Sequence, residues 1–162
     1  MSVVVSDTSP LHYLILCGAE TALPRLFSRV VIPPMVFREL QQPNTPAPVR
    51  QWASSLPAWA TVQSPKNLDL SLDVDAGELE AICLAREIKA AAVLMDDRAG
   101  RIAAIHCGLA VIGTIGLLEQ AAAHGLVDLP RVMERLRQTN ARLDPGLIQA
   151  ALERDKTRKK PR

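Results

Sequence analysis

Aromatic residues are scarce in this sequence. Its 162 residues include two Phe, two Trp and one Tyr. Modules that bind single-stranded nucleic acid by base stacking, such as RRM and OB folds, depend on several exposed aromatic rings. The composition therefore argues against those modules.

The sequence also lacks long apolar runs and a secretory leader. No run approaches the roughly 18 apolar residues of a membrane-spanning helix, and the N-terminus has no basic start followed by an apolar stretch. We therefore expect a cytoplasmic protein that does not enter the membrane. Cysteines are few, odd in number and widely spaced, so we expect buried free thiols rather than disulfides or a metal site at Cys17, Cys83 and Cys107.

Charge is distributed unevenly along the chain. The net charge of the chain is +2. Residues 154–162 carry six basic side chains and one acidic one, so the rest of the chain has a net charge of −3. A basic tail on an acidic body is typical of proteins that bind a polyanion or an acidic partner. A solvated terminus without a partner fits the pattern equally well.

Short aliphatic runs alternate with helical patterns along the chain. We expect strands at 3–5, 29–32, 60–63, 91–95 and 109–112. Helices are expected at 10–16, 22–27, 34–40, 49–56, 76–89, 101–108, 115–124, 130–139 and 145–156. This alternation indicates right-handed βαβ units, hence an α/β fold with a mostly parallel sheet covered on both faces. With no repeat and no linker, residues 1–127 and the terminal helices and tail at 128–162 should form one domain.

Acidic side chains follow two of the predicted buried strands. Asp7 comes after the valine run 3–5, and Asp96 comes directly after 91–95. Because the carboxyl ends of parallel strands meet at one edge of a sheet, both carboxylates should lie where α/β proteins bind ligands. Glu39 lies in the helix after the second strand, and Glu78 lies in the first turn of the helix before Asp96.

Four carboxylates near one edge repel one another unless a cation neutralises them. Carboxylate oxygens without accompanying Cys or His ligands favour Mg²⁺ or Mn²⁺ over zinc. Such a site suits hydrolysis of a phosphodiester by water.

Asp7, Glu39 and Glu78 also fit purely structural roles, and the residues alone do not decide between these roles and a functional site. Ser9 is the expected N-cap of the first helix, and Asp7 can stabilise the turn before it. Glu39 fits a solvated helix position, and Glu78 fits a capping box with Asp75. Three hydroxyls fit either a site or a turn (Thr8, Ser9 and Thr114), and three histidines without metal-ligand spacing fit ordinary helix positions (His12, His106 and His124).

Other phosphate chemistries fit less well. Asp7-Thr8-Ser9 is not the paired-aspartate motif of aspartyl-phosphate phosphatases, and the pair Asp96-Asp97 is far from the first strand, where a receiver domain would carry it. The sequence has no Gly-rich phosphate loop and no nucleophile elbow.

Five segments in order along residues 3–127 form a familiar pattern: 5–11 (VSDTSPL), 32–40 (IPPMVFREL), 75–82 (DAGELEAI), 94–98 (LMDDR) and 111–118 (VIGTIGLL). Together they resemble the PIN-domain family of metal-dependent nucleases, particularly the prokaryotic branch that includes toxin ribonucleases of toxin–antitoxin pairs. The resemblance implies three α/β/α layers with strand order 3-2-1-4-5. It also implies one or two Mg²⁺ or Mn²⁺ ions held by Asp7, Glu39, Glu78 and Asp96. Many members have an aspartate at the third position, so Glu78 and Asp75 both remain candidates for it.

The sequence therefore predicts a Mg²⁺/Mn²⁺-dependent endoribonuclease. Asp7 and Asp96 are the expected main ligands, and Glu39 and Glu78 complete the shell or position the water. Phosphates are expected to bind Arg98, Arg101 and the basic tail. The resemblance further implies a toxin with an RNA substrate, a small antitoxin partner and a homodimer. A non-catalytic module that binds nucleic acid or protein, and an enzyme acting on another phosphate compound, remain alternatives.

Overall fold

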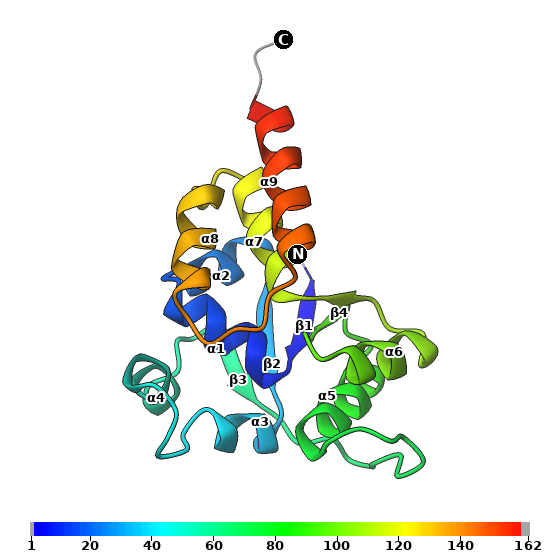
Figure 1. The fold of residues 1–162 in the computed structure, drawn as a ribbon. Coiled ribbons are helices and arrows are strands. Elements are labelled where there is room, and N and C mark those ends of the chain that lie inside the picture. Colours follow the sequence, from blue (N-terminus) through cyan, green and yellow to red (C-terminus); the bar gives the residue numbers. More distant parts are fainter. Residues whose placement is uncertain (1, 160–162) are drawn as a thin grey trace.

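A five-stranded, all-parallel β-sheet forms the centre of the computed structural model, which describes residues 2–159 (Figure 1). The strands are β1 (Val3–Ser6), β2 (Arg29–Ile32), β3 (Ala60–Val62), β4 (Ala92–Leu94) and β5 (Val111–Ile112). Their order in the sheet is β3-β2-β1-β4-β5, and every neighbouring pair is parallel. The predicted α/β class and strand order are confirmed, and β1 is the middle strand.

Helices cover both faces of the sheet. One face carries α5 (Ala76–Glu87) and α6 (Arg98–His106), drawn in green in Figure 1. The other face carries α1 (Thr8–Leu16), α2 (Leu23–Leu26), α3 (Pro34–Glu39), α4 (Ala47–Ser54), α7 (Thr114–Ala123), α8 (Leu129–Arg137) and α9 (Pro145–Lys159). A short 3₁₀ turn, Glu20–Ala22, precedes α2.

The strands are aliphatic throughout because each face of the sheet packs against helices. Successive residues of a strand point to opposite faces, so Val4 packs into one core with Leu11 of α1, and Val5 packs into the other with Ile82 of α5. Both valines are completely buried. Central burial of this kind fixes the register of β1, and with it the position at which the chain leaves the sheet.

The last two helices pack into the same core as Val4. Leu129 and Met133 of α8 and Ile148 of α9 are buried in it. None of the helices in residues 2–159 is both long enough and apolar enough to cross a lipid bilayer. The cysteines in this part of the chain are free, as expected, although Cys107 is half-buried rather than buried.

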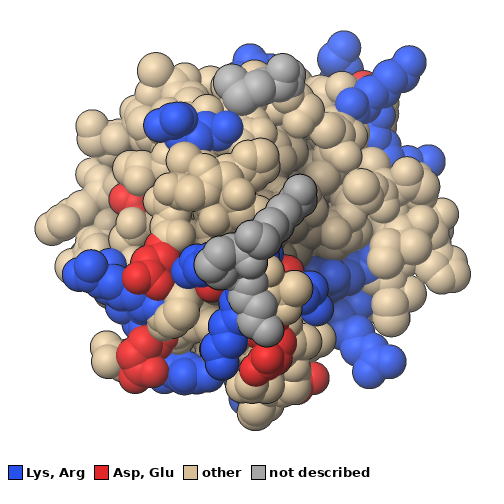
Figure 2. Space-filling model, turned by 90° about the horizontal axis from the view of Figure 1, so that it is seen from above, with Lys and Arg blue, Asp and Glu red and all other residues tan. Residues whose placement is uncertain are grey.

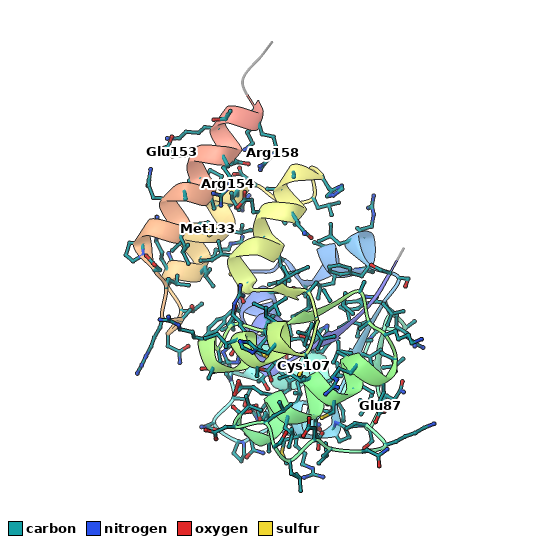
Figure 3. The ribbon with its side chains drawn as sticks, turned by 90° about the vertical axis from the view of Figure 1, so that its right-hand side faces the viewer. Glu87, Cys107, Met133, Glu153, Arg154 and Arg158 are labelled. Carbon is teal, nitrogen blue, oxygen red and sulfur yellow. The ribbon has the colours of Figure 1, made fainter. Side chains whose placement is uncertain are left out.

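The positive charges near the C-terminus are paired with acids. Arg154 of α9 binds Glu119 of α7 through two hydrogen bonds of 2.6 and 2.8 Å. Asp155 is 1% exposed, and its carboxylate forms ion pairs with two basic side chains. The pairs within α9 are Arg158–Asp155 at 2.8 Å, Lys159–Asp155 at 3.0 Å and Lys156–Glu153 at 3.7 Å (Figure 3).

These pairs change the interpretation of the tail. Its described part, up to residue 159, is a helix whose cations are bound to the protein's own carboxylates, and residues 160–162 lie outside the described part. Figure 2 accordingly shows basic and acidic side chains interspersed near the C-terminal end, without one continuous basic face.

Candidate functional site

Asp7 lies where the middle strand ends. Its backbone N–H donates to the carbonyl of Leu94 at 2.9 Å, which extends the pairing of β1 with β4 by one residue. Helix α1 begins at Thr8, so Asp7, and not Ser9, is the N-cap residue. The Asp7 side chain makes no capping hydrogen bond and is 8% exposed. Its carboxylate is therefore buried at the edge of the sheet without capping α1.

Three carboxylates from separate segments surround Gly77 in the first turn of α5. A Cβ atom on Gly77 would lie 2.9 Å from Glu39 Oε1, 3.5 Å from Asp7 Oδ1 and 3.6 Å from Asp75 Oδ1. Any larger residue at this position would displace the Glu39 carboxylate. Glycine thus permits Asp7, Glu39 and Asp75 to meet.

Asp96 is fixed at the same edge by the first residue of α7. The backbone N–H of Thr114 donates to Asp96 Oδ1 at 2.7 Å, and the Thr114 hydroxyl donates to Oδ2 at 2.6 Å. The next residue, Asp97, caps α6 by accepting from the Gly100 N–H at 3.2 Å. The prediction that Asp97 caps this helix is confirmed, and the choice of Asp96 as the site acid stays a prediction.

Glu78 forms the predicted capping box with Asp75. The Glu78 N–H donates to Asp75 Oδ1 at 2.8 Å, and the Asp75 N–H donates to Glu78 Oε1 at 3.4 Å. Glu78 is 4% exposed, and its Oε2 lies against Gly100 of α6 with no hydrogen-bond partner in the described residues. Glu78 therefore points toward α6, whereas Asp75 lies with Asp7 and Glu39. The choice of Glu78 as third acid stays a prediction, and this geometry favours Asp75.

Burial and mutual repulsion dominate the electrostatics of these acids. The pKa of Asp7 is raised to about 7, mainly by desolvation. The Thr8 N–H lowers it, and the Asp75, Glu39 and Asp96 carboxylates add to the rise. Desolvation likewise raises the pKa of Glu78 to about 8, with Asp75 adding to the effect. Within residues 2–159, no Lys, Arg or His side chain lies within 4 Å of these carboxylates. Bound protons or a cation would therefore relieve the repulsion within this cluster at neutral pH.

The donor set suits a hard divalent cation. Carboxylate oxygens are the ligands that Mg²⁺ and Mn²⁺ prefer, and the unpartnered Oε2 of Glu78 adds a free buried acceptor beside Asp75. As they stand, no three Asp, Glu, His or Cys side chains of the described chain are close enough to hold one ion. Binding an ion would therefore draw the mutually repelling carboxylates together.

Two hydroxyls and one carboxylate hold Glu39 in place. The Thr8 hydroxyl donates to Glu39 Oε2 at 2.5 Å, and the Thr45 hydroxyl donates to the Glu39 carbonyl at 3.0 Å. Helix α3 has six residues and follows Pro33, which offers no capping side chain. Glu80 Oε1 of α5 instead accepts from the Met35 N–H at 2.9 Å. Glu80 therefore ties the helix that carries Glu39 to the helix that begins beside Asp75.

Sequence reasoning did not identify Glu80 or Gly77 as parts of the site. A clue was present, since residues three apart share one face of a helix. Gly77 and Glu80 have this spacing, and both face α3. Thr8 and Thr114 were left open between site and turn, and both donate to site carboxylates.

Comparison with known proteins gives one match. A family model described as a PIN domain matches residues 3–157. No curated protein matches the sequence.

Replacing Asp7 with Asn should stabilise the metal-free protein in a pH-dependent way. The Asp7 carboxyl keeps its proton up to about pH 7 when folded but ionises near 3.8 when unfolded, so ionisation disfavours folding as pH rises between these values. The gain in unfolding free energy should be near zero at pH 4 and reach roughly 1–4 kcal/mol at pH 8. Urea unfolding with a chelator present measures it. A variant less stable than the wild type at pH 8 would contradict the assignment.

Replacing Glu80 with Ala should loosen α3 by removing the acceptor for the Met35 N–H. Loss of one such hydrogen bond should speed hydrogen exchange at Met35 by about tenfold. Glu80→Gln keeps an acceptor oxygen and should stay near the wild-type rate. NMR-detected exchange measures both variants, and unchanged protection in Glu80→Ala would show that the cap is dispensable.

Proposed function

We propose that this chain, which belongs to the PIN-domain family, is an endoribonuclease that depends on Mg²⁺ or Mn²⁺. Membership of the family points to a nuclease, and PIN domains generally depend on a divalent metal. RNA as substrate and the choice of metal are parts of the proposal. The observation that carries it is the cluster of carboxylates around the buried Asp7 at the carboxyl edge of the sheet, with no basic side chain of residues 2–159 paired to it.

The proposed ligands are Asp7, Glu39 and Asp96, with Asp75 or Glu78 as the fourth acid. A divalent ion bound there would neutralise these carboxylates and polarise the scissile phosphate. Thr114 fixes both oxygens of Asp96, and Thr8 fixes one oxygen of Glu39, so these carboxylates are oriented before substrate arrives. Pre-oriented groups need little rearrangement during the reaction.

Glu78 has a separate place in this proposal. Its Oε2 is buried against Gly100 and has no hydrogen-bond partner in the described residues. If Asp75 is the ligand, Glu78 positions the water or holds a proton behind the cluster. If Glu78 is the ligand, its side chain rotates from Gly100 toward Asp7.

A groove of about 970 Å³ extends from Asp96 and suits the phosphates of an RNA strand. Arg98 of α6 and Arg142 of the loop before α9 line it, and neither has an acid within 4 Å among residues 2–159. Arg101 and Arg154 also line the groove but bind the Met95 carbonyl and Glu119. Arg98 and Arg142 are therefore the cations available to phosphates.

The toxin role, the small antitoxin partner, the homodimer and the cytoplasmic location remain proposals that rest on the resemblance. Ile102 and Ile105 of α6 are 47% and 58% exposed, which suits a protein–protein contact.

Calorimetric titration of Mn²⁺ is the first test, because metal binding needs no substrate. The wild type should bind, and Asp96→Asn should weaken binding at least about tenfold by removing a ligand. A larger loss in Asp75→Asn than in Glu78→Gln would identify Asp75 as the fourth acid. Asp128→Asn, which alters an exposed carboxylate before α8, is the control and should bind as the wild type does.

Cleavage of a long RNA in Mn²⁺ completes this test. The wild type should cleave, and well-folded Asp7→Asn and Asp96→Asn should not. Wild-type rates in either variant, or no metal binding at millimolar concentration, would favour a binding module on the same fold.

Replacing Arg98 or Arg142 of the groove with Ala should weaken RNA binding and make the affinity less dependent on salt. Each lost phosphate contact should lower the slope of log affinity against log salt by about 0.7 for a single strand. Arg98→Ala and Arg142→Ala should each lower this slope. Each is made in the Asp96→Asn protein, so that the RNA is bound but not cleaved during the measurement. Lys156→Ala is the control, because Lys156 already pairs with Glu153. An equal effect of Lys156→Ala would contradict the proposed phosphate path.

A further inference from the structure

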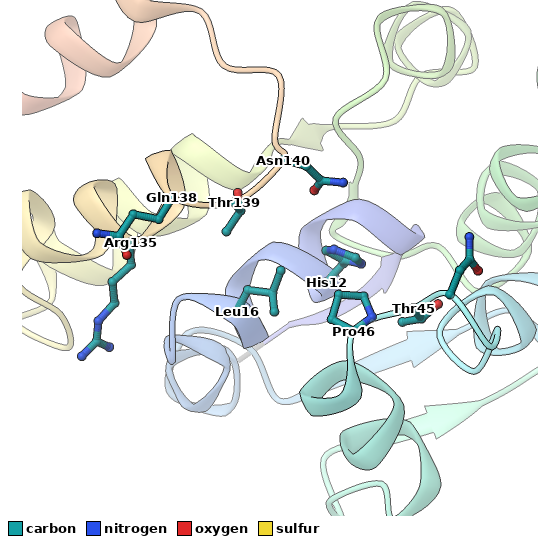
Figure 4. Close-up of a pocket in the computed structure, with 9 residues that line it drawn as sticks. His12, Leu16, Thr45, Pro46, Arg135, Gln138, Thr139 and Asn140 are labelled. Carbon is teal, nitrogen blue, oxygen red and sulfur yellow. The ribbon is translucent and has the colours of Figure 1, made fainter.

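We propose that a second pocket beside the carboxylate cluster binds one nucleobase of the RNA and thereby selects the base next to the cleaved bond. This inference rests on the proposed function. The pocket has a volume of about 750 Å³ and lies between α1, the loop that leads into α4, and the end of α8 (Figure 4).

The pocket adjoins the carboxylates through two segments. On α1, His12 lies one turn beyond Thr8, which binds Glu39, and four helical residues span about 6 Å. On the other side, Thr45 lines the pocket and donates to the Glu39 carbonyl. When the phosphate of a nucleotide lies at the carboxylate cluster, the base of that nucleotide can therefore reach the pocket.

Apart from Arg135, the polar lining of the pocket is neutral. It consists of the His12 imidazole, amides and hydroxyls, with Leu16 and Pro46 as apolar surfaces. Amides and imidazole offer both donors and acceptors, and base edges present both kinds of group. The amides are those of Asn44, Gln138 and Asn140.

A phosphate would find little to hold it in this pocket. The cation in the lining is Arg135, which donates to the Cys17 carbonyl at 3.0 Å. Figure 4 shows the Arg135 guanidinium directed away from His12 and Thr45. The groove at Asp96 instead carries unpaired arginines, so phosphates and bases have separate places.

His12 supplies an unused polar atom. Its Nε2 is buried and has no hydrogen-bond partner in the described residues, and desolvation lowers the pKa of His12, which keeps the ring neutral at neutral pH. The ring packs edge-on against Tyr13, with centroids 4.8 Å apart. A buried polar atom without a partner is costly. Because Nε2 has almost no accessible surface, the His12 ring turns toward the pocket when a base edge supplies that partner.

Asn140 connects the pocket to the groove. It lines both cavities, and its Oδ1 accepts from the Tyr13 hydroxyl at 3.3 Å. An RNA strand can therefore run from the arginines of the groove, past Asp96 and Asp7, to the pocket at His12.

The first experiment measures base binding without cleavage. Each of the four ribonucleosides is titrated into the metal-free protein, and the imidazole and side-chain amide resonances are followed by NMR. One nucleoside should shift the His12 and Asn140 resonances saturably and leave His124 unchanged. His12→Ala and Asn140→Ala should each weaken binding roughly tenfold, the loss expected for one hydrogen bond, and exposed His124→Ala should not. If no nucleoside shifts these resonances at millimolar concentration, the proposal is wrong.

The second experiment maps cleavage sites in a random-sequence RNA with Mn²⁺. The wild type should prefer one base at a fixed position beside the cleaved bond, and His12→Ala should reduce that preference about tenfold while cleavage continues. A preference that both pocket variants leave unchanged overturns the inference but leaves the nuclease proposal intact. Nucleoside binding at His12 without any RNA cleavage overturns the nuclease proposal and retains the base site.

Discussion

The repulsion between the buried Asp7 carboxylate and its acidic neighbours at one edge of the sheet is the constraint on which the rest of the site depends. Asp7 is placed there by the register of the central strand, and no basic side chain of the described residues approaches it. The surrounding structure tolerates the repulsion by holding each acid separately. Thr114 fixes Asp96, Thr8 fixes Glu39, and the missing side chain of Gly77 leaves room between them. The repulsion that remains lowers the stability of the folded chain, and a bound cation would relieve it.

Features set by local sequence were predictable. Aliphatic runs defined the strands, the acids at their ends defined the edge, and the spacing of Asp75 and Glu78 defined the capping box. The strand order came from the family resemblance and matches the sheet. Helix ends were less accurate: α1 begins at Thr8 rather than 10, because Asp7 already has the extended backbone of an N-cap residue.

Features set by the packing of distant segments were not predictable. Which of Asp75 and Glu78 meets Asp7 depends on how α5 is rotated against α3 and α6, and that rotation has no signature in the spacing. The pairing of Arg154 had no local signal, because its partner Glu119 lies 35 residues away. The pocket at His12 is completed by the end of α8, more than a hundred residues later.

The loop between α8 and α9 borders both the groove and the pocket but carries none of the acids. On the proposed functions, part of the choice of RNA is therefore encoded apart from the chemistry. Relatives that keep the acids can diverge in target by changes confined to this loop and the adjoining helix end. The same separation makes the loop the natural segment to exchange between related proteins when a new cleavage specificity is sought.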